Sequence, residues 1–209
     1  MSLRLSGGRR LQSPSGSTAR PTPSRVRLAM MNILAAELPG CRWLDLCCGS
    51  GVMACEALQR GAAAVVAVEQ NRRHAAVARA NLDEVQAGLA HPVAVRVACS
   101  EVCRWLSQAR EEPFDLIYAD PPYRAGLYAP ICAALKRADL LHPGGTLLLE
   151  CATAEPPELP AGWRLRDRRT YGSTTVLLLQ IASEASAAPA TRELAATEQP
   201  AGKRQARIS

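Results

Sequence analysis

The chain has 209 residues, 48% of them hydrophobic and 21% charged, a size and balance that favour one globular domain with a full core. No apolar run reaches the roughly 18 residues that a membrane helix needs, and the arginine-rich start lacks the apolar segment of a secretory signal. We therefore expect neither a membrane-spanning nor a secreted protein. The expected protein is cytoplasmic and has no membrane partner.

The formal net charge of +6 is concentrated at the N-terminus. Residues 1–30 hold six arginines and no acid, whereas residues 31–182 have a net charge of −1 and residues 183–209 of +1. Only Lys136 and Lys203 are lysines among the 25 basic residues. Because arginine suits phosphate contacts and stacking on bases, we expect residues 1–22 to form a basic RNA-binding arm. A purely solubilising arm is the alternative.

The pattern along the chain predicts an α/β domain over residues 23–182. A helix is expected to begin at Thr22 and Pro23 and to end before Pro39. From residue 42 onward, strands expected at 43–46, 64–68, 93–98, 114–119 and 146–150 alternate with helices expected at 52–60, 71–86, 101–108 (capped by Ser100) and 127–138. Such alternation with continuous apolar strands favours a parallel sheet covered on both faces. Residues 163–171 and 174–181 are expected to pair as a hairpin, and residues 183–209 to form a disordered tail.

The cysteines, at positions 41, 47, 48, 55, 99, 103, 132 and 151, are expected to be reduced, since no export signal accompanies them. No two of them have the CxxC spacing of a zinc site, so no metal is expected. Adjacent Cys47 and Cys48 stand where a tight loop needs small residues.

Polar residues follow three of the expected strands. Asp45 leads into the loop 47–51, whose glycines let the backbone approach a ligand and whose next helix offers its N-terminal amides. Glu69 closes the second strand, where a carboxylate can accept both hydroxyls of a ribose. Residues 100–102 follow the third strand, where a polar side chain and a backbone N–H can contact an adenine edge. Because ligands gather at the carboxyl ends of parallel strands, these segments predict a nucleotide-like cofactor.

Two cofactor classes fit these positions. Residues 49–54 match the GxGxxA pattern of dinucleotide-binding proteins, which is a weak signal alone. S-adenosylmethionine is the second class, and Asp45 favours it, because a carboxylate repels a pyrophosphate but attracts the ammonium group of a methionine.

The segment Asp120-Pro121-Pro122-Tyr123 follows the buried strand expected at 114–119. Proline fixes φ and has no N–H, so the carbonyls of Asp120 and Pro121 have few local donors and can point outward. Together with one carboxylate and one aromatic face, they suit a planar group with an exocyclic NH2, such as a nucleobase. A tight turn capped by the acid is the alternative.

In order and spacing, Asp45–Gly51, Glu69, Glu101-Val102 and Asp120–Tyr123 resemble the class I S-adenosylmethionine-dependent methyltransferases. The Asp-Pro-Pro-Tyr segment is similar to that of members that methylate amino or amide nitrogens. Residues 7–11 (GGRRL), 20–22 (RPT) and 25–27 (RVR) narrow the resemblance to the RsmD family, which methylates guanine N2 in bacterial small-subunit ribosomal RNA. The resemblance covers about residues 4–181.

This resemblance implies a Rossmann-like fold, with a mostly parallel seven-stranded sheet, a C-terminal antiparallel hairpin and helices on both faces. It implies a monomer that uses S-adenosylmethionine and acts on 16S ribosomal RNA of the small ribosomal subunit, at the family target G966. Asp120 and Pro121 would hold the hydrogens of N2, Tyr123 would stack a flipped guanine, and arginines would hold phosphates. The expected site residues are Asp120, Pro121, Pro122 and Tyr123 for catalysis; Asp45, Cys47, Gly49, Ser50, Gly51, Glu69, Gln70, Glu101 and Val102 for the cofactor; and Arg9, Arg10, Arg20, Thr22, Arg25, Arg27 and Arg124 for RNA.

The chain departs from the family pattern mainly in the RNA-contacting segment. Ser24 stands where the family usually has an acid, Leu28 where it commonly has Glu, and the stretch between residues 8 and 20 is shorter and less basic. Two other functions stay open: the same chemistry on adenine N6 or glutamine N5, and a non-catalytic RNA-binding assembly factor. The chain leaves no room for the target-recognition insertion of a DNA enzyme, and the glycine loop is intact. A dinucleotide oxidoreductase leaves the Asp-Pro-Pro-Tyr segment unexplained.

Overall fold

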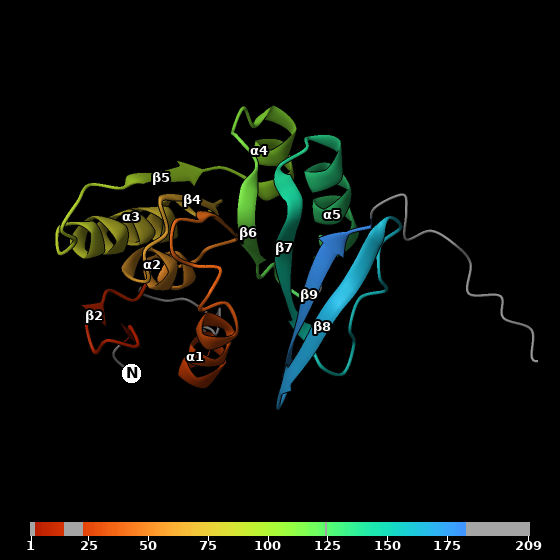
Figure 1. Ribbon diagram of the computed structural model, residues 1–209, viewed down its shortest axis with the longest axis horizontal. Helices are drawn as coiled ribbons and strands as arrows, with labels where there is room; N and C mark the ends of the chain where they lie inside the picture. The colour runs from red at the N-terminus through yellow and green to blue at the C-terminus, as the bar shows by residue number, and fades with distance from the viewer. Residues whose placement is uncertain (1–2, 15–22, 124, 183–209) are drawn as a thin grey trace, which may run out of the picture.

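The computed structural model describes residues 3–14, 23–123 and 125–182, within which strands and helices alternate along the chain (Figure 1). The strands are β1 (Leu3–Arg4), β2 (Arg10–Leu11), β3 (Arg42–Leu46), β4 (Ala64–Glu69), β5 (Ala94–Cys99), β6 (Phe114–Ala119), β7 (Leu141–Ala152), β8 (Trp163–Tyr171) and β9 (Thr174–Ile181). The helices are α1 (Ser24–Ile33), α2 (Val52–Gln59), α3 (Arg72–Gln86), α4 (Val102–Gln108) and α5 (Tyr128–Arg137). The expected alternation is confirmed. Arg20, Thr22, Arg124 and the expected tail 183–209 lie outside the described residues.

One sheet joins seven of these strands in the order β5-β4-β3-β6-β7-β9-β8. β3 pairs in parallel with β4 on one side and with β6 on the other, and β5 and β7 extend the parallel part outward. β9 runs antiparallel to both β7 and β8, which confirms the expected C-terminal hairpin. The strand order reverses between β3 and β6, so the carboxyl ends of these two strands mark the place where open α/β sheets bind ligands.

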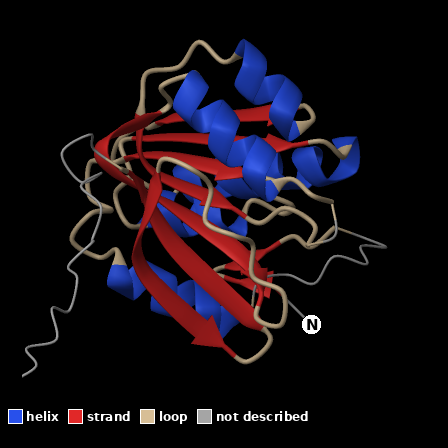
Figure 2. Cartoon of the chain, turned by 90° about the vertical axis from the view of Figure 1, so that its right-hand side faces the viewer, coloured by secondary structure: helices blue, strands red, loops and turns tan. Residues whose placement is uncertain are grey.

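Alternate residues of the central strands face two separate cores, because side chains in a strand point to opposite sides. Trp43, Tyr118 and Leu148 belong to the core that α1, α2 and α3 cover. Leu44 and Ile117 belong to the core that α4 and α5 cover. Figure 2 shows the helices on both sides of the sheet. Among the described residues, no helix is long and apolar enough to cross a membrane.

The small hairpin of β1 and β2 packs on α2 and α3. Three of its leucines are buried in the core shared with these helices: Leu3, Leu5 and Leu11. The backbone N–H of Ser6 donates to the carboxylate of Glu56 in α2 at 2.9 Å. The buried side chain of Asn81 in α3 accepts from the backbone N–H of Gln12 at 2.8 Å and donates to the backbone carbonyl of Gln12 at 3.0 Å. Residues 3–12 of the expected basic arm are therefore joined to the domain.

Three helix boundaries differ from the expectation. α1 begins at Ser24, and its N-cap is Pro23 rather than Thr22. α1 ends at Ile33 rather than near residue 38, because residues 34–38 continue in tighter turns that bury Leu34 and Leu38. The N-cap of α4 is Glu101 rather than Ser100, because the longer carboxylate reaches two backbone amides of the first turn, each at 2.8 Å.

β7 is longer than expected at its start. It begins at Leu141, which pairs with Phe114 of β6, and the register shifts before Leu116 pairs with Thr146. The shift accommodates residues 143–145, which precede the strand expected at 146–150.

The sheet ends on one side at β8, which is largely exposed. Only Trp163 of its nine residues is buried, and four of the others are arginines: Arg164, Arg166, Arg168 and Arg169. Arg166 pairs with Glu37 at 2.7 Å, and Arg169 pairs with Asp167 at 2.6 Å. The turn between β8 and β9 lies at the carboxyl end of β7, because Thr174 pairs with Ala152.

Candidate active site

The loop that follows β3 has a backbone shape that its glycines allow. Gly49 and Gly51 have positive φ angles of 54° and 73°, and Cys47 shares this left-handed conformation at 62°. A Cβ on Gly51 would lie 3.1 Å from the Cβ of Ala78 in α3, so a side chain there would crowd the helix. No described atom lies within 4 Å of the place that a Cβ on Gly49 would take. The loop therefore leaves open space for a ligand beside its backbone.

Asp45 lies near the end of β3 and is 1% exposed. Its Oδ2 accepts a hydrogen bond from the N–H of Ala54, in the first turn of α2, at 3.0 Å. Burial raises the pKa of Asp45 to about 8; the bond from Ala54 acts in the opposite direction, and the charge of Glu69 adds to the rise. An ionised carboxylate at this position is therefore favoured by a cation bound beside it.

Glu69 ends β4 and ties it to the glycine loop. Its Oε2 accepts from the N–H of Gly49 at 2.9 Å, and its Oε1 accepts from the N–H of Asn71 at 2.8 Å. Each carboxylate oxygen has a second lone pair. Glu69 can therefore accept ligand hydroxyls while it keeps both backbone bonds.

The Asp-Pro-Pro-Tyr turn begins directly after β6. The N–H of Asp120 donates to the carbonyl of Leu46 at the end of β3, at 3.3 Å, which holds the turn beside the glycine loop. Pro121 is buried and Pro122 is exposed. The parallel pairing of β6 with β7 brings Asp120 level with Glu150. Burial, followed by the charges of Glu150 and Asp45, raises the pKa of Asp120 well above its ordinary value.

Glu150 is absent from the expected site residues, although it lies in the same cluster as Asp120. It is 3% exposed within β7, and its Oε2 accepts a hydrogen bond from the hydroxyl of Tyr118 in β6. The Tyr118 ring stacks with Trp43, with 6.4 Å between the ring centroids. The signal available in the sequence is its position at the expected end of the fifth strand, equivalent to that of Glu69.

Two tyrosines lie beside this acid pair. Tyr123 is 42% exposed, and its hydroxyl donates to Oε1 of Glu150 at 3.5 Å. Burial, with Glu150 and Asp120, raises the pKa of Tyr123 to about 12, so it stays a neutral phenol. The buried hydroxyl of Tyr128, at the start of α5, has no hydrogen-bond partner among the described residues.

The remaining expected cofactor residues lie at the same edge of the sheet. The carbonyl of Ser50 accepts from the Asn81 amide at 2.9 Å, and Gln70 is exposed after β4. Glu101 caps α4. Partial burial acts to raise its pKa, but the hydrogen bonds from the backbone amides of residues 103 and 104 outweigh this effect and lower the pKa. Val102 is buried as the first residue of α4. No group of three or more His, Cys, Asp or Glu side chains in the described part of the chain could hold a metal ion.

The four described arginines of the expected RNA surface differ in their surroundings. Arg10 and Arg25 are exposed. Arg9 donates to the carbonyl of Glu84 in the last turn of α3 at 2.7 Å. Arg27 is 4% exposed, and its Nε lies 3.7 Å from the carboxylate of Glu56. A guanidinium buried in this way does not reach an RNA phosphate, so the expectation for Arg27 is corrected: it joins α1 to α2.

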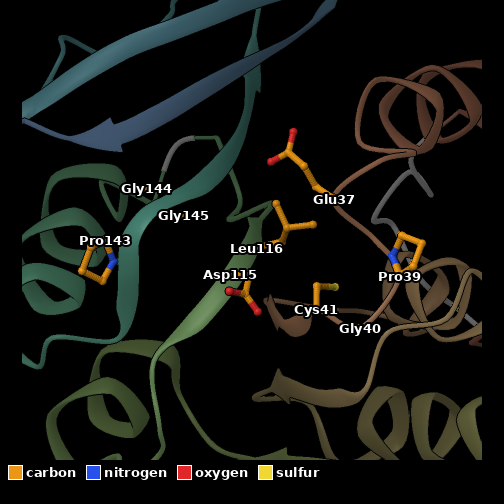
Figure 3. A pocket seen from close by; sticks show the side chains of 9 residues that line it. All are labelled: Glu37, Pro39, Gly40, Cys41, Asp115, Leu116, Pro143, Gly144 and Gly145. Carbon is orange, nitrogen blue, oxygen red and sulfur yellow. The ribbon is translucent and has the colours of Figure 1, made fainter.

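At the opposite edge of the sheet, a hollow of about 390 Å³ lies at the amino ends of β3, β6 and β7 (Figure 3). Its polar side chains already have partners: Glu37 pairs with Arg166, and Asp115 accepts from the backbone N–H of Arg42 at 2.8 Å. Burial, with the charge of Asp115, raises the pKa of the Cys41 thiol to about 12, so the thiol stays protonated. The candidate active site therefore lies at the carboxyl edge, where the acids converge.

Comparisons with known proteins agree with this fold. The family described as "Conserved hypothetical protein 95" matches residues 5–180. The ribosomal RNA small subunit methyltransferase D of Escherichia coli K12 is 31% identical over 174 residues, which cover 83% of this chain and 85% of that protein. The putative rRNA methyltransferase YlbH of Bacillus subtilis is 27% identical over 172 residues, covering 82% and 92%.

Among solved structures, the putative methyltransferase yhhF from Escherichia coli superposes with a TM-score of 0.75 and 29% identity, covering 88% of this chain and all of that one. The expected class I methyltransferase fold is thereby confirmed. The chain belongs to the "Conserved hypothetical protein 95" family, the RsmD family of methyltransferases.

Proposed function

We propose that this protein transfers a methyl group from S-adenosylmethionine to the exocyclic N2 of a guanine in the 16S ribosomal RNA of the small ribosomal subunit, with G966 as the expected target. The observation that carries the proposal is the hydrogen bond from Asp120 to Leu46, which holds the Asp-Pro-Pro-Tyr turn against the end of β3 and its glycine loop. The names of the relatives in Escherichia coli and Bacillus subtilis support ribosomal RNA as the substrate class.

The residues around the glycine loop fit this cofactor by their chemistry. Asp45 is a buried carboxylate that a cation would stabilise, which suits the methionine ammonium and the sulfonium. Glu69 keeps acceptor capacity for the ribose hydroxyls, and Gly49 leaves space at the loop. When bound, S-adenosylmethionine supplies the electrophilic methyl group. A dinucleotide would instead bring a negatively charged pyrophosphate toward the Asp45 carboxylate, and the two groups would repel each other.

Asp120 and Pro121 supply the acceptors for the target amine. The N2 lone pair of guanine is delocalised into the ring, so this nitrogen is a poor nucleophile unless its hydrogens are held and its lone pair is turned outward. The Asp120 carboxylate and the Pro121 carbonyl perform this task, so most of the rate comes from positioning and electrostatics. Asp120 need not be a strong base, because the departing proton becomes acidic once the nitrogen is methylated.

Tyr123 and the exposed arginines contact the RNA in this proposal. The exposed ring of Tyr123 stacks the flipped guanine, a contact worth about 1–3 kcal/mol. Arg10 and Arg25 are exposed and hold phosphates, which makes RNA binding depend steeply on salt.

In the test, the protein and labelled S-adenosylmethionine are incubated in parallel with small ribosomal subunits, naked 16S RNA and DNA, and the modified base is mapped. We expect label in the RNA or the subunit, as N2-methylguanine, and none in DNA. Label in adenine or in protein would assign the same chemistry to another target. RNA binding with no transfer, in a protein that does not bind S-adenosylmethionine by calorimetry, would point to an assembly factor.

A further inference from the structure

Glu150 receives hydrogen bonds from tyrosines on both sides, and this arrangement links the core to the mouth of the site. Its Oε2 accepts from Tyr118, which is 2% exposed, and its Oε1 accepts from Tyr123, which is 42% exposed. One bond is therefore inside the domain, and the other is at the surface where the base would bind.

The inner half of this arrangement is rigid. Glu150 lies within β7, where it pairs with Val176 of β9, and Tyr118 lies within β6 and stacks with Trp43 at an interplanar angle of 16°. Groups carried by paired strands hold their positions better than groups carried by loops. The carboxylate is thus a fixed point for whatever contacts it.

The outer half has few other supports. Tyr123 follows two prolines that have no N–H, and its ring is the most exposed part of the turn that can stack on a base. Its hydroxyl donates to Glu150 at 3.5 Å, and Thr174 of β9 lies beside it. A bond of this length is near the outer limit of hydrogen-bond geometry, and it restricts the direction in which the hydroxyl, and hence the ring, can point.

We propose that Glu150 is a positioning residue of the site: its carboxylate transmits the fixed geometry of Tyr118 and Trp43 to Tyr123 and so sets the orientation of the base-stacking ring. This inference rests on the proposed function for the identity of the stacked group. In this proposal Glu150 acts as a hydrogen-bond acceptor for Tyr123. That role is distinct from the effect of its negative charge on the pKa of Asp120.

Kinetics with RNA separate these roles. E150M removes the acceptor, E150Q keeps an acceptor without the charge, and Y123F keeps the ring without the hydroxyl. We expect E150M and Y123F each to lower kcat/KM for RNA about fivefold to tenfold, with the Kd for S-adenosylmethionine within about twofold of wild type.

Rescue and non-additivity then test the acceptor role. The kcat/KM of E150Q for RNA should be at least about threefold higher than that of E150M. The E150M/Y123F double variant should be no slower than the slower single variant, because both remove one interaction. Losses that multiply, or E150Q as slow as E150M, would overturn the proposal.

A paired variant excludes simple loss of stability. E150M leaves the Tyr118 hydroxyl buried without its acceptor, whereas Y118F/E150M removes both partners and should melt at a higher temperature than E150M alone. We expect Y118F/E150M to remain as slow as E150M on RNA. Recovery of wild-type kcat/KM in this variant would show that Glu150 matters only for folding.

A spectroscopic measurement needs no turnover and is independent of the substrate. The four tyrosines can be labelled as 3-fluorotyrosine, and Y123F assigns the ¹⁹F resonance of Tyr123. In E150M we expect this resonance to move toward the position of free fluorotyrosine, and in E150Q to stay near its wild-type position. An unchanged resonance in E150M would refute the positioning role. Failure of the proposed function alone would instead appear as wild-type protein that does not methylate RNA.

Discussion

Replacing Asp45 by asparagine should change how the stability of the ligand-free protein depends on pH. The pKa of Asp45 is about 8 in the folded protein, against an ordinary value of 3.8. Between these two values the folded protein retains a proton that the unfolded chain has released, so the free energy of unfolding falls as pH rises. One such proton gives about 1.36 kcal/mol per pH unit, or about 2.5 kcal/mol between pH 5 and pH 7.

The assay is urea unfolding of the wild type and D45N at pH 5, 6 and 7. Asparagine can still accept the bond from Ala54, so the stability of D45N relative to wild type should rise by about 2.5 kcal/mol across this range. Groups that do not interact with Asp45 titrate in both proteins and cancel in the difference. D83N, which changes an exposed carboxylate on α3, is the matched control and should show a constant difference. A difference for D45N that stays constant to within about 0.5 kcal/mol would refute the reasoning.

Three further outcomes are expected. D120A should lower kcat on RNA by at least about 10²-fold and leave the calorimetric Kd for S-adenosylmethionine within about twofold, and a variant that keeps most of its rate would remove Asp120 from the mechanism. In urea unfolding, G51A should lose about 1–3 kcal/mol more of its free energy of unfolding than the control G144A, because both glycines have positive φ but only Gly51 lies against a neighbouring helix. Equal losses would mean that α3 moves aside without a loss of stability. E56Q should cost about 3 kcal/mol of stability, because it removes the carboxylate that pairs with the buried Arg27 and accepts from Ser6 of the hairpin, and hydrogen exchange should rise in residues 3–11. An unchanged protein would show that Glu56 does not anchor the hairpin.

Much of the site can be predicted from local pattern alone. Asp45, Glu69 and Asp120 each come at or near the end of an apolar run, and a parallel sheet necessarily brings such ends to one edge. The Asp-Pro-Pro-Tyr turn is also a local signal, because its prolines and acid are adjacent. The predicted elements therefore place these residues correctly without knowledge of any long-range contact.

The parts that sequence analysis missed depend on distant partners. Glu150 is an ordinary polar residue near a strand end until the pairing of β6 with β7 sets it beside Tyr118, 32 positions earlier in the chain. Arg27 flanks the apolar stripe of α1, and distant partners explain why its side chain turns inward: the carboxylate of Glu56 in α2 and the carbonyl of Arg4. The single acid in the otherwise apolar stretch VMACEAL is a usable signal, since a buried carboxylate requires donors or a cation.

The open margin of the sheet at β8 affects how two molecules can meet. A bare strand edge offers unpaired backbone groups to any chain that approaches it, and here that edge carries four arginines against one aspartate. Two copies aligned along this margin would set like charges opposite each other, so their repulsion disfavours strand-to-strand growth. Because salt screens exposed charges, any self-association through this margin should strengthen as ionic strength rises, the reverse of what is expected for contacts with nucleic acid.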